Sequence, residues 1–432
     1  MRLLLSLVLG LTATTLVAED RPLIVDLLGI NGHAVRFKPD IYQPLTHFVR
    51  TYHPMEWDLN GRTDTVPAFP FTRNRLDWSA NYGTWKQHGF DIDCSLLFDS
   101  IKASDWIDPE LNGKAYGHAF ASAFGPSAPG SLVSSVEIGN EPSGYTNEQY
   151  TTLFSALASG IRTGDPKLRI ASCAVTIGPS TPRARSIECF RGLDHLLDVL
   201  TIHLSARLEE RPTWESSFPE DPRLAYIKQI RDVLAWRDRN APAKPIWITE
   251  FGWDCSTKRP NPNDSFAKWI GVTDQQQAQW MVRATLLLTS LDIQRMYVQA
   301  ADDADEPGPD RGAGITRNGV PKPSFYAMIH LVKTLGGHRF EGVIRQDHDA
   351  VVVRFRNATD KLKTVIVAWS PTGDDRSVPF TTPLPADRRV VRMQRMPLGE
   401  QLEDMPPPTT AADGSVTVTL TESPLYVWLD AR

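Results

Sequence analysis

Short apolar runs alternate with longer amphipathic stretches from residue 22 to residue 337. This alternation is typical of repeated βα units, in which a helix follows each strand of a parallel sheet. Eight strands favour a closed (β/α)8 barrel over an open doubly wound sheet, and no Gly-x-Gly-x-x-Gly motif follows the first strand. The predicted strands span residues 23–28, 47–52, 90–98, 132–138, 168–174, 199–204, 245–249 and 295–300. The predicted helices, with apolar residues at three- and four-residue spacing, span residues 148–161, 224–237, 274–291 and 324–334.

The pattern changes after residue 337, where apolar and polar residues alternate with a period of two. Strands of this kind are predicted over residues 350–355, 363–369, 389–393 and 415–420. Asn, Asp, Gly and Pro residues separate them, as in a small antiparallel sandwich. We therefore predict a (β/α)8 barrel over residues 19–337, followed by an all-β sandwich over residues 338–432.

The N-terminus has the pattern of a secretory signal peptide. A basic residue, Arg2, precedes an apolar run over residues 3–17, and a small residue, Ala18, stands at the expected cleavage flank. The run is short for a bilayer span, and a polar segment follows it. We predict that residues 1–18 are a signal peptide, that the mature chain has no membrane span, and that the protein is secreted or periplasmic.

The charge balance argues against a nucleic-acid partner. The chain has 46 Lys and Arg against 51 Asp and Glu, which gives a formal net charge of −5. Acidic and basic residues are interspersed, so no broad basic surface is expected.

Four cysteines, Cys94, Cys173, Cys189 and Cys255, allow three pairings, and none has C-x-x-C spacing. Because export permits disulfides, we expect at least one bridge. Cys189 is a partner for either Cys173, which is close in sequence, or Cys255.

Two predicted strands end in glutamates. Functional side chains of a (β/α)8 barrel project from the carboxyl ends of its strands. Glu141 follows the fourth strand, between Asn140 and Pro142, and Glu250 ends the seventh. Three βα units separate them, so we expect the two side chains to face each other across the barrel mouth. Glu137, by alternation, is expected to point into the barrel wall or interior.

This pair of carboxyl groups fits the hydrolysis of a glycosidic bond with retention of configuration. That reaction needs one carboxylic acid to protonate the departing oxygen and one carboxylate to attack the sugar carbon. We assign Glu141 as acid/base and Glu250 as nucleophile. The amide of Asn140 is placed to bond a sugar hydroxyl beside the reacting carbon. The reaction needs no metal and no organic cofactor.

Two segments, Asn-Glu-Pro at residues 140–142 and Thr-Glu-Phe-Gly at residues 249–252, resemble the paired signatures of the clan A glycoside hydrolases. In that clan the acid/base follows Asn at the end of strand four, and the nucleophile ends strand seven. The appended sandwich is similar to that of family 39 and of related families such as 30 and 79.

The resemblance implies roles for two further residues. Arg50 matches the strand-two arginine that orients the nucleophile and keeps it ionised, with a surface salt bridge as the alternative. His203 matches a strand-six histidine near the nucleophile, with a core histidine as the alternative. Trp253, three residues after Glu250, is a candidate for stacking on a sugar ring, although it equally fits packing under its loop.

The sequence also departs from the clan pattern. Ser205 stands two residues after His203, where many members carry Tyr, and the eighth strand ends without the usual Trp. The strand runs instead into an acidic loop at residues 302–310, which we interpret as solvated charge rather than a calcium site, because it has no regular ligand spacing.

We therefore expect a retaining glycoside hydrolase that cleaves β-glycosidic bonds of an oligosaccharide or polysaccharide. The alternative is a noncatalytic carbohydrate-binding or cell-surface protein on a glycosidase-like barrel. Two opposed carboxylates favour the enzyme, since a binding protein does not need them.

Overall fold

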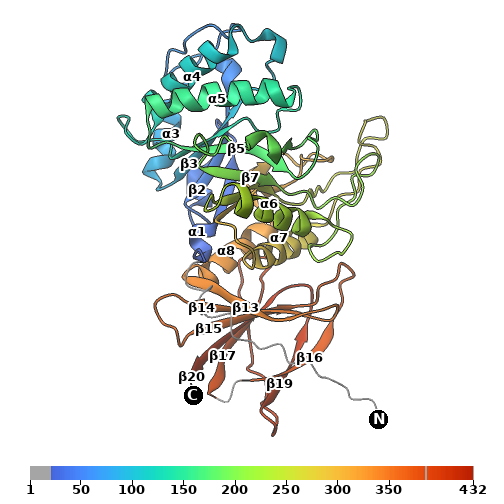
Figure 1. The fold of residues 1–432 in the computed structure, drawn as a ribbon. Coiled ribbons are helices and arrows are strands. Elements are labelled where there is room, and N and C mark those ends of the chain that lie inside the picture. Colours follow the sequence, from blue (N-terminus) through green and yellow to red (C-terminus); the bar gives the residue numbers. More distant parts are fainter. Residues whose placement is uncertain (1–20, 385–386, 432) are drawn as a thin grey trace, which may run out of the picture.

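The computed structural model describes residues 21–384 and 387–431, and the predicted signal peptide lies outside them. Figure 1 shows a helix-covered barrel at one end of the molecule and antiparallel sheets at the other.

Eight parallel strands close the barrel. They pair in the order β1-β2-β3-β4-β5-β7-β8-β9, and β9 pairs with β1 to complete the ring. The predicted fold, a (β/α)8 barrel followed by an all-β sandwich, is confirmed. The barrel strands are β1 (Leu28–Gly32), β2 (Phe48–Pro54), β3 (Asp91–Leu97), β4 (Ser135–Ile138), β5 (Arg169–Thr176), β7 (Val199–His203), β8 (Ile246–Phe251) and β9 (Arg295–Val298).

The first strand lies later in the chain than predicted. Residues 23–28 were expected to form it, but α1 (Ile24–Leu27) is a one-turn helix and β1 begins at Leu28. The strand contains Gly29, where a Cβ would lie 2.5 Å from the ring of Tyr297. A glycine is required for this close approach, so the strand lacks the continuous apolar run by which a buried strand is recognised.

Six longer helices surround the barrel. The four predicted helices are present with small shifts at their ends, and α5 and α7 each begin at a threonine capping box, at Thr146 and Thr273. Among the described residues, no helix is long and apolar enough to cross a membrane. The helices are α3 (Trp78–Gln87), α4 (Pro109–Phe124), α5 (Asn147–Gly164), α6 (Tyr226–Asn240), α7 (Asp274–Leu288) and α8 (Pro323–Leu335).

Several short elements occupy the loops between the barrel units. Three strands after β9 form a separate small sheet, in the order β10-β11-β12. These elements are α2 (Pro39–Tyr42), η1 (Met55–Trp57), η2 (Ala103–Asp105), β6 (Arg185–Ser186), η3 (Ile187–Phe190), β10 (Ala300–Asp303), β11 (Gly314–Arg317) and β12 (Val320–Pro321).

The C-terminal part contains a six-stranded antiparallel sheet, ordered β13-β14-β15-β20-β17-β18, and the pair β16–β19. Alternate residues of β14 serve different cores: Val351 and Val353 belong to the core that includes the barrel, whereas Val352 packs with Phe380 of β16. Successive side chains of β14 thus point to opposite faces of the sheet, and both faces are buried at this strand. The strands are β13 (His338–Gln346), β14 (Val351–Asn357), β15 (Thr364–Trp369), β16 (Val378–Pro383), β17 (Arg388–Arg395), β18 (Asp404–Met405), β19 (Ser415–Leu420) and β20 (Leu425–Ala431).

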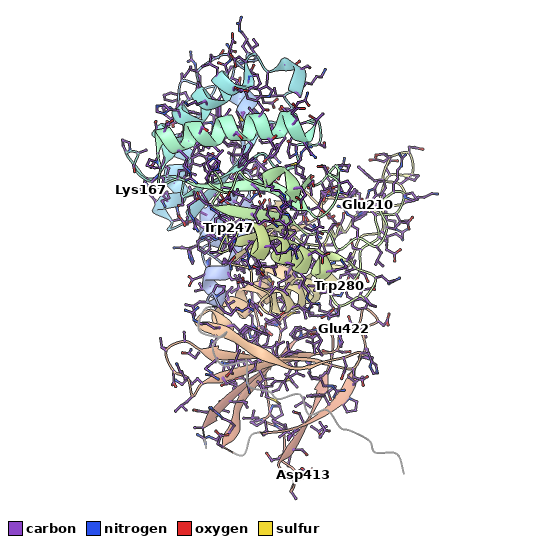
Figure 2. The ribbon with its side chains drawn as sticks, in the orientation of Figure 1. Lys167, Glu210, Trp247, Trp280, Asp413 and Glu422 are labelled. Carbon is purple, nitrogen blue, oxygen red and sulfur yellow. The ribbon has the colours of Figure 1, made fainter. Side chains whose placement is uncertain are left out.

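A buried arginine joins the barrel to the sandwich. Arg283 of α7 donates from Nε to Glu220 at 3.0 Å and from Nη1 to the carbonyl of Thr372 at 2.9 Å. Its Nη1 also lies 3.7 Å from Glu422, a residue of the sandwich that Figure 2 labels near the barrel. Trp369 of β15 donates to the same Glu220. The charge-assisted bonds fix the orientation of one part on the other.

The expectation of a disulfide is wrong: all four cysteines are free. Cys94 and Cys173 are buried on barrel strands β3 and β5, and Cys255 is buried after β8. Cys94 and Cys173 therefore pack as small side chains of the buried core, whereas Cys255 accepts a hydrogen bond from Lys322 at 3.3 Å.

Candidate active site

The backbone after β4 is shaped to present Glu141 at the barrel mouth. Gly139 turns the chain with a positive φ of 82°, a conformation that a residue with a Cβ rarely adopts. Arg185 donates hydrogen bonds to the carbonyls of Pro142 and Tyr145, and these bonds hold the turn in place. The side chain of Glu141 remains 24% exposed.

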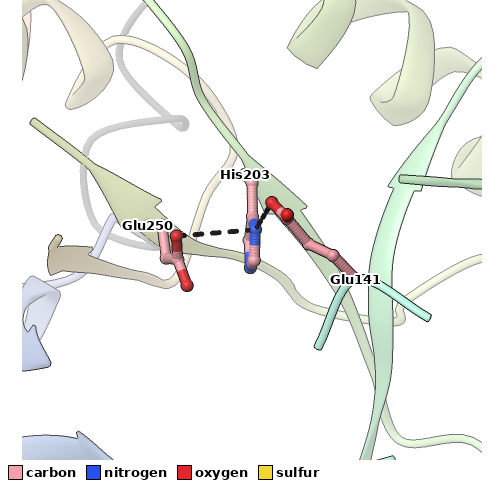
Figure 3. Close-up of side chains that lie close together, drawn as sticks. All are labelled: Glu141, His203 and Glu250. Carbon is pink, nitrogen blue, oxygen red and sulfur yellow. Dashed lines mark hydrogen bonds and ion pairs between the residues drawn. The ribbon is translucent and has the colours of Figure 1, made fainter. Parts of the chain in front are cut away.

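His203 lies between the two glutamates (Figure 3). Its Nδ1 is 3.0 Å from Oε1 of Glu141 and 3.7 Å from Oε2 of Glu250. In the barrel register, His203 of β7 pairs with Glu250 of β8, which sets this contact. Burial alone lowers the pKa of His203, but the charge of Glu250 and the hydrogen bond to Glu141 outweigh it, so the pKa is raised above its ordinary value. The raised pKa favours the charged form of the ring, which lies between the two carboxyl groups.

Arg50 is fully buried and its guanidinium contacts four side chains. Nε and Nη2 donate to Glu137 at 3.0 and 2.8 Å. Nη1 donates to Asn31 at 2.7 Å and to Glu250 at 3.3 Å. Nη2 also donates to Oδ1 of Asn140 at 2.8 Å. Since a guanidinium only donates, the oxygen of Asn140 must face it, and the amide NH₂ is left to donate elsewhere.

Tyr52 is a site residue that the sequence analysis missed. Its hydroxyl donates to Oε1 of Glu250 at 2.6 Å. Burial and the charge of Glu250 raise the pKa of Tyr52 well above its ordinary value, so the phenol stays neutral and remains a donor. Tyr52 lies two residues after Arg50 in β2, and the two-residue period of a strand was the signal that places both on one face.

Two compartments open on Glu141 and Glu250. The larger, of about 590 Å³, is lined by Asn31, Tyr52 and Asn140 and by residues of the β1–β2 and β10 segments. The smaller, of about 270 Å³, is lined by His203, Arg207 and other residues that follow β5, β7 and β8. Glu141 and Glu250 line both compartments, so they lie where the two meet.

Trp253 does not reach the cleft, which corrects its prediction as a sugar-stacking residue. Its ring is 3% exposed and packs edge-on against Trp280. Its Nε1 donates to the carbonyl of Ser217 at 2.8 Å, so the polar edge is also occupied. Residue 253 follows β8 closely, but the loop turns its side chain down into the core.

The structure therefore brings together Glu141, Glu250, Asn140, Arg50 and His203, which were all proposed from the sequence. Glu137 lies in the barrel interior, as its alternation indicated, and it is the main partner of Arg50. One ligand atom from each of Glu141, His203 and Glu250 lies within 4.8 Å of the others, a spacing that a metal ion also accepts.

No protein-family model matches the chain, and no curated protein matches it in sequence. Solved structures do match it. A family 39 glycoside hydrolase from the gut symbiont Bacteroides cellulosilyticus WH2 has a TM-score of 0.69 at 17% identity, over 96% of this chain and 82% of that one. A glucosidase from Croceicoccus marinus has a TM-score of 0.63 at 14% identity, over 94% and 96%.

A Paenibacillus polymyxa xyloglucanase of glycoside hydrolase family 44 has a TM-score of 0.59 at 11% identity, over 96% of this chain and 98% of that one. At these identities the likeness concerns the fold. The predicted resemblance to clan A glycoside hydrolases is confirmed at that level, because these structures share the closed barrel and nearly the whole chain aligns with them.

Proposed function

We propose that the protein is a retaining glycoside hydrolase, which cleaves β-glycosidic bonds of an oligosaccharide or polysaccharide by double displacement. The observation that carries this proposal is the spacing of the two carboxylates: an oxygen of Glu141 lies within 4.8 Å of an oxygen of Glu250. Retaining enzymes hold their carboxyl groups roughly 5–5.5 Å apart, whereas inverting enzymes leave about 6.5–9.5 Å for a water molecule.

In the first step, a carboxylate oxygen of Glu250 attacks the anomeric carbon and the glycosidic C–O bond breaks. The electron pair goes to the departing oxygen, which takes the proton of Glu141. Tyr52 and Arg50 stabilise the carboxylate form of Glu250 before the attack.

In the second step, water attacks the same carbon of the glycosyl-enzyme. Glu141, now a carboxylate, takes a proton from the water, and Glu250 departs with its negative charge restored. The amide NH₂ of Asn140 donates to the sugar hydroxyl beside the reacting carbon, because Arg50 holds the other end of that amide.

His203 is a positioning residue in this scheme. Nδ1 of its ring lies 3.0 Å from Glu141 and 3.7 Å from Glu250, so the ring keeps the two carboxyl groups on either side of the glycosidic bond. It also offsets the charge on Glu141 after the proton has left.

The test uses aryl β-glycosides of several sugars with Glu250→Gln and Glu141→Gln variants. Both changes are expected to abolish hydrolysis of a glycoside that the wild type cleaves, while the control Glu148→Gln, on the exposed face of α5, keeps it. Activity that survives both active-site changes excludes the proposal. Activity that a chelator removes and Zn²⁺ restores would instead assign the three-residue cluster to a metal.

We also propose that the protein acts outside the cytoplasm, since residues 1–18 have the pattern of a signal peptide. Mass spectrometry of the protein from the culture medium or periplasm is expected to find a mature N-terminus near Glu19. Recovery of the intact Met1 form in the cytoplasm alone contradicts this.

A further inference from the structure

An ion pair crosses the mouth of the cleft. Nη2 of Arg183 lies 3.0 Å from Oδ2 of Asp310. Arg183 follows β5, and Asp310 lies between β10 and β11, which follow β9. Since β7 and β8 lie between β5 and β9 in the barrel, this pair joins loops on either side of the strands that carry His203 and Glu250.

The Asp310 end of the ion pair is held by several bonds. Nη2 of Arg207 lies 2.6 Å from Oδ1 of Asp310, and Nε2 of Gln299 donates to the same oxygen at 3.0 Å. The backbone N–H of Asp310 donates to buried Asp254 at 2.9 Å. Asp310 has a positive φ of 62°, which the bond to Asp254 helps to fix.

The Arg183 end is held by a tight turn. The N–H of Thr181 donates to the carbonyl of Ala184 at 2.8 Å, and the hydroxyl of Thr181 accepts from the N–H groups of Arg183 and Ala184. Both ends are thus preorganised, and the ion pair does not depend on a long free loop.

The same ion pair divides the two compartments. Five residues line both of them: Glu141, Glu250, Gln299, Arg183 and Asp310. The side chains of Arg183 and Asp310 are 38% and 41% exposed, whereas that of Glu250 is 13% exposed. The glutamates therefore form the inner side of the junction between the compartments, and the ion pair forms its outer side.

We infer, on the basis of the proposed glycosidase function, that the Arg183–Asp310 ion pair restricts the enzyme to the ends of β-linked saccharide chains. The larger compartment takes the sugar that Glu250 attacks, because it contains Tyr52 and Asn140. The smaller compartment takes the leaving group. A saccharide chain that occupies both compartments must pass between the ion pair and the glutamates. It therefore enters by one of its ends, because the ion pair closes the side of this passage.

The test uses a β-linked hexasaccharide of the sugar whose aryl glycoside the enzyme cleaves, labelled at its reducing end with a fluorescent amine. The wild type is expected to release one unit of fixed length from a chain end, so that a single labelled product appears at the earliest times. A mixture of labelled products of several lengths at those times overturns the inference.

Arg183→Ala removes the ion pair and is expected to raise the fraction of internal cleavage by about tenfold, the size of a typical subsite discrimination. Asp310→Asn, which keeps the side-chain shape, is the second variant if Arg183→Ala does not fold. Asp64→Asn breaks an exposed Arg62–Asp64 ion pair away from the cleft and serves as the matched control. An unchanged product pattern in a folded, active ion-pair variant overturns the inference.

The two proposals fail in different ways. A wild type that cleaves the aryl glycoside and yields mixed hexasaccharide products loses only the chain-end restriction. A wild type that cleaves neither the aryl glycosides nor the oligosaccharides loses the proposed glycosidase function and, with it, this inference.

Discussion

Tyr52 donates its hydroxyl hydrogen to the carboxylate oxygen of Glu250 across 2.6 Å, and Arg50 approaches that same oxygen at 3.3 Å. One oxygen of the proposed nucleophile thus receives two donors from β2, and the other faces His203 at 3.7 Å. We assign the attack to this second oxygen, because its contact with His203 is the longest of the three and leaves it the less tightly bound.

Replacing Tyr52 by Phe tests the first of these donors. A hydrogen bond to a charged group contributes about 1.5–3 kcal/mol, so Tyr52→Phe is expected to lower kcat/KM for an aryl β-glycoside by roughly 10- to 100-fold. The melting temperature should change little, because the buried ring is retained. A variant with wild-type kcat/KM would show that this bond does not act on the nucleophile.

From the buried Arg50–Glu137 pair we predict that a second substitution restores stability to an Arg50 variant but does not restore its activity. Arg50→Met leaves the carboxylate of Glu137 buried without its cation, which is expected to cost about 3–5 kcal/mol of unfolding free energy. Adding Glu137→Gln removes that unpaired charge. Urea denaturation should show that the double variant is more stable than Arg50→Met, while both remain inactive; equal stability of the two contradicts the pairing.

His203 predicts a pH-dependent contribution to stability. Its pKa is raised in the folded protein, so its contribution is fully present below the unfolded value of about 6.5 and is lost as the pH rises through the higher folded value. The difference in melting temperature between wild type and His203→Gln should therefore be largest in mildly acidic solution and shrink toward alkaline pH. A difference that grows with pH contradicts the raised pKa.

Because the four cysteines are free, we predict that a reductant does not change the thermal stability of the protein. The melting temperature should be the same with and without a phosphine reductant, because no disulfide constrains the described chain. After unfolding in denaturant without reductant, all four thiols should react with iodoacetamide, and mass spectrometry counts the adducts. Fewer than four adducts would reveal a bridge.

The main elements of the site could be predicted because their positions follow from the order of the strands. Glu141 and Glu250 stand at the ends of the fourth and seventh barrel strands, and a closed barrel brings these ends to one mouth. Neither assignment required knowledge of side-chain packing. The chemistry of a pair of carboxyl groups then indicated hydrolysis of a glycosidic bond, without any side-chain contact.

What the sequence did not predict depends on side-chain packing and loop paths. Trp253 is close to Glu250 in sequence, but the path of its loop decides that its ring is buried against Trp280. The first strand lacked a recognisable apolar run because Gly29 accommodates Tyr297. The Arg183–Asp310 ion pair joins loops 127 residues apart in sequence, and no local pattern indicates such a contact.

The bidentate bond between Arg50 and Glu137 has a consequence over the whole reaction cycle. In the proposed reaction, Glu250 is a carboxylate before the attack, an ester in the glycosyl-enzyme, and a carboxylate again at the end. The guanidinium is anchored by a different carboxylate, so it has no reason to move when the charge on Glu250 disappears. The dipoles around the nucleophile therefore need little reorganisation between the two half-reactions, and the barrier of the second step includes little cost for rebuilding the site.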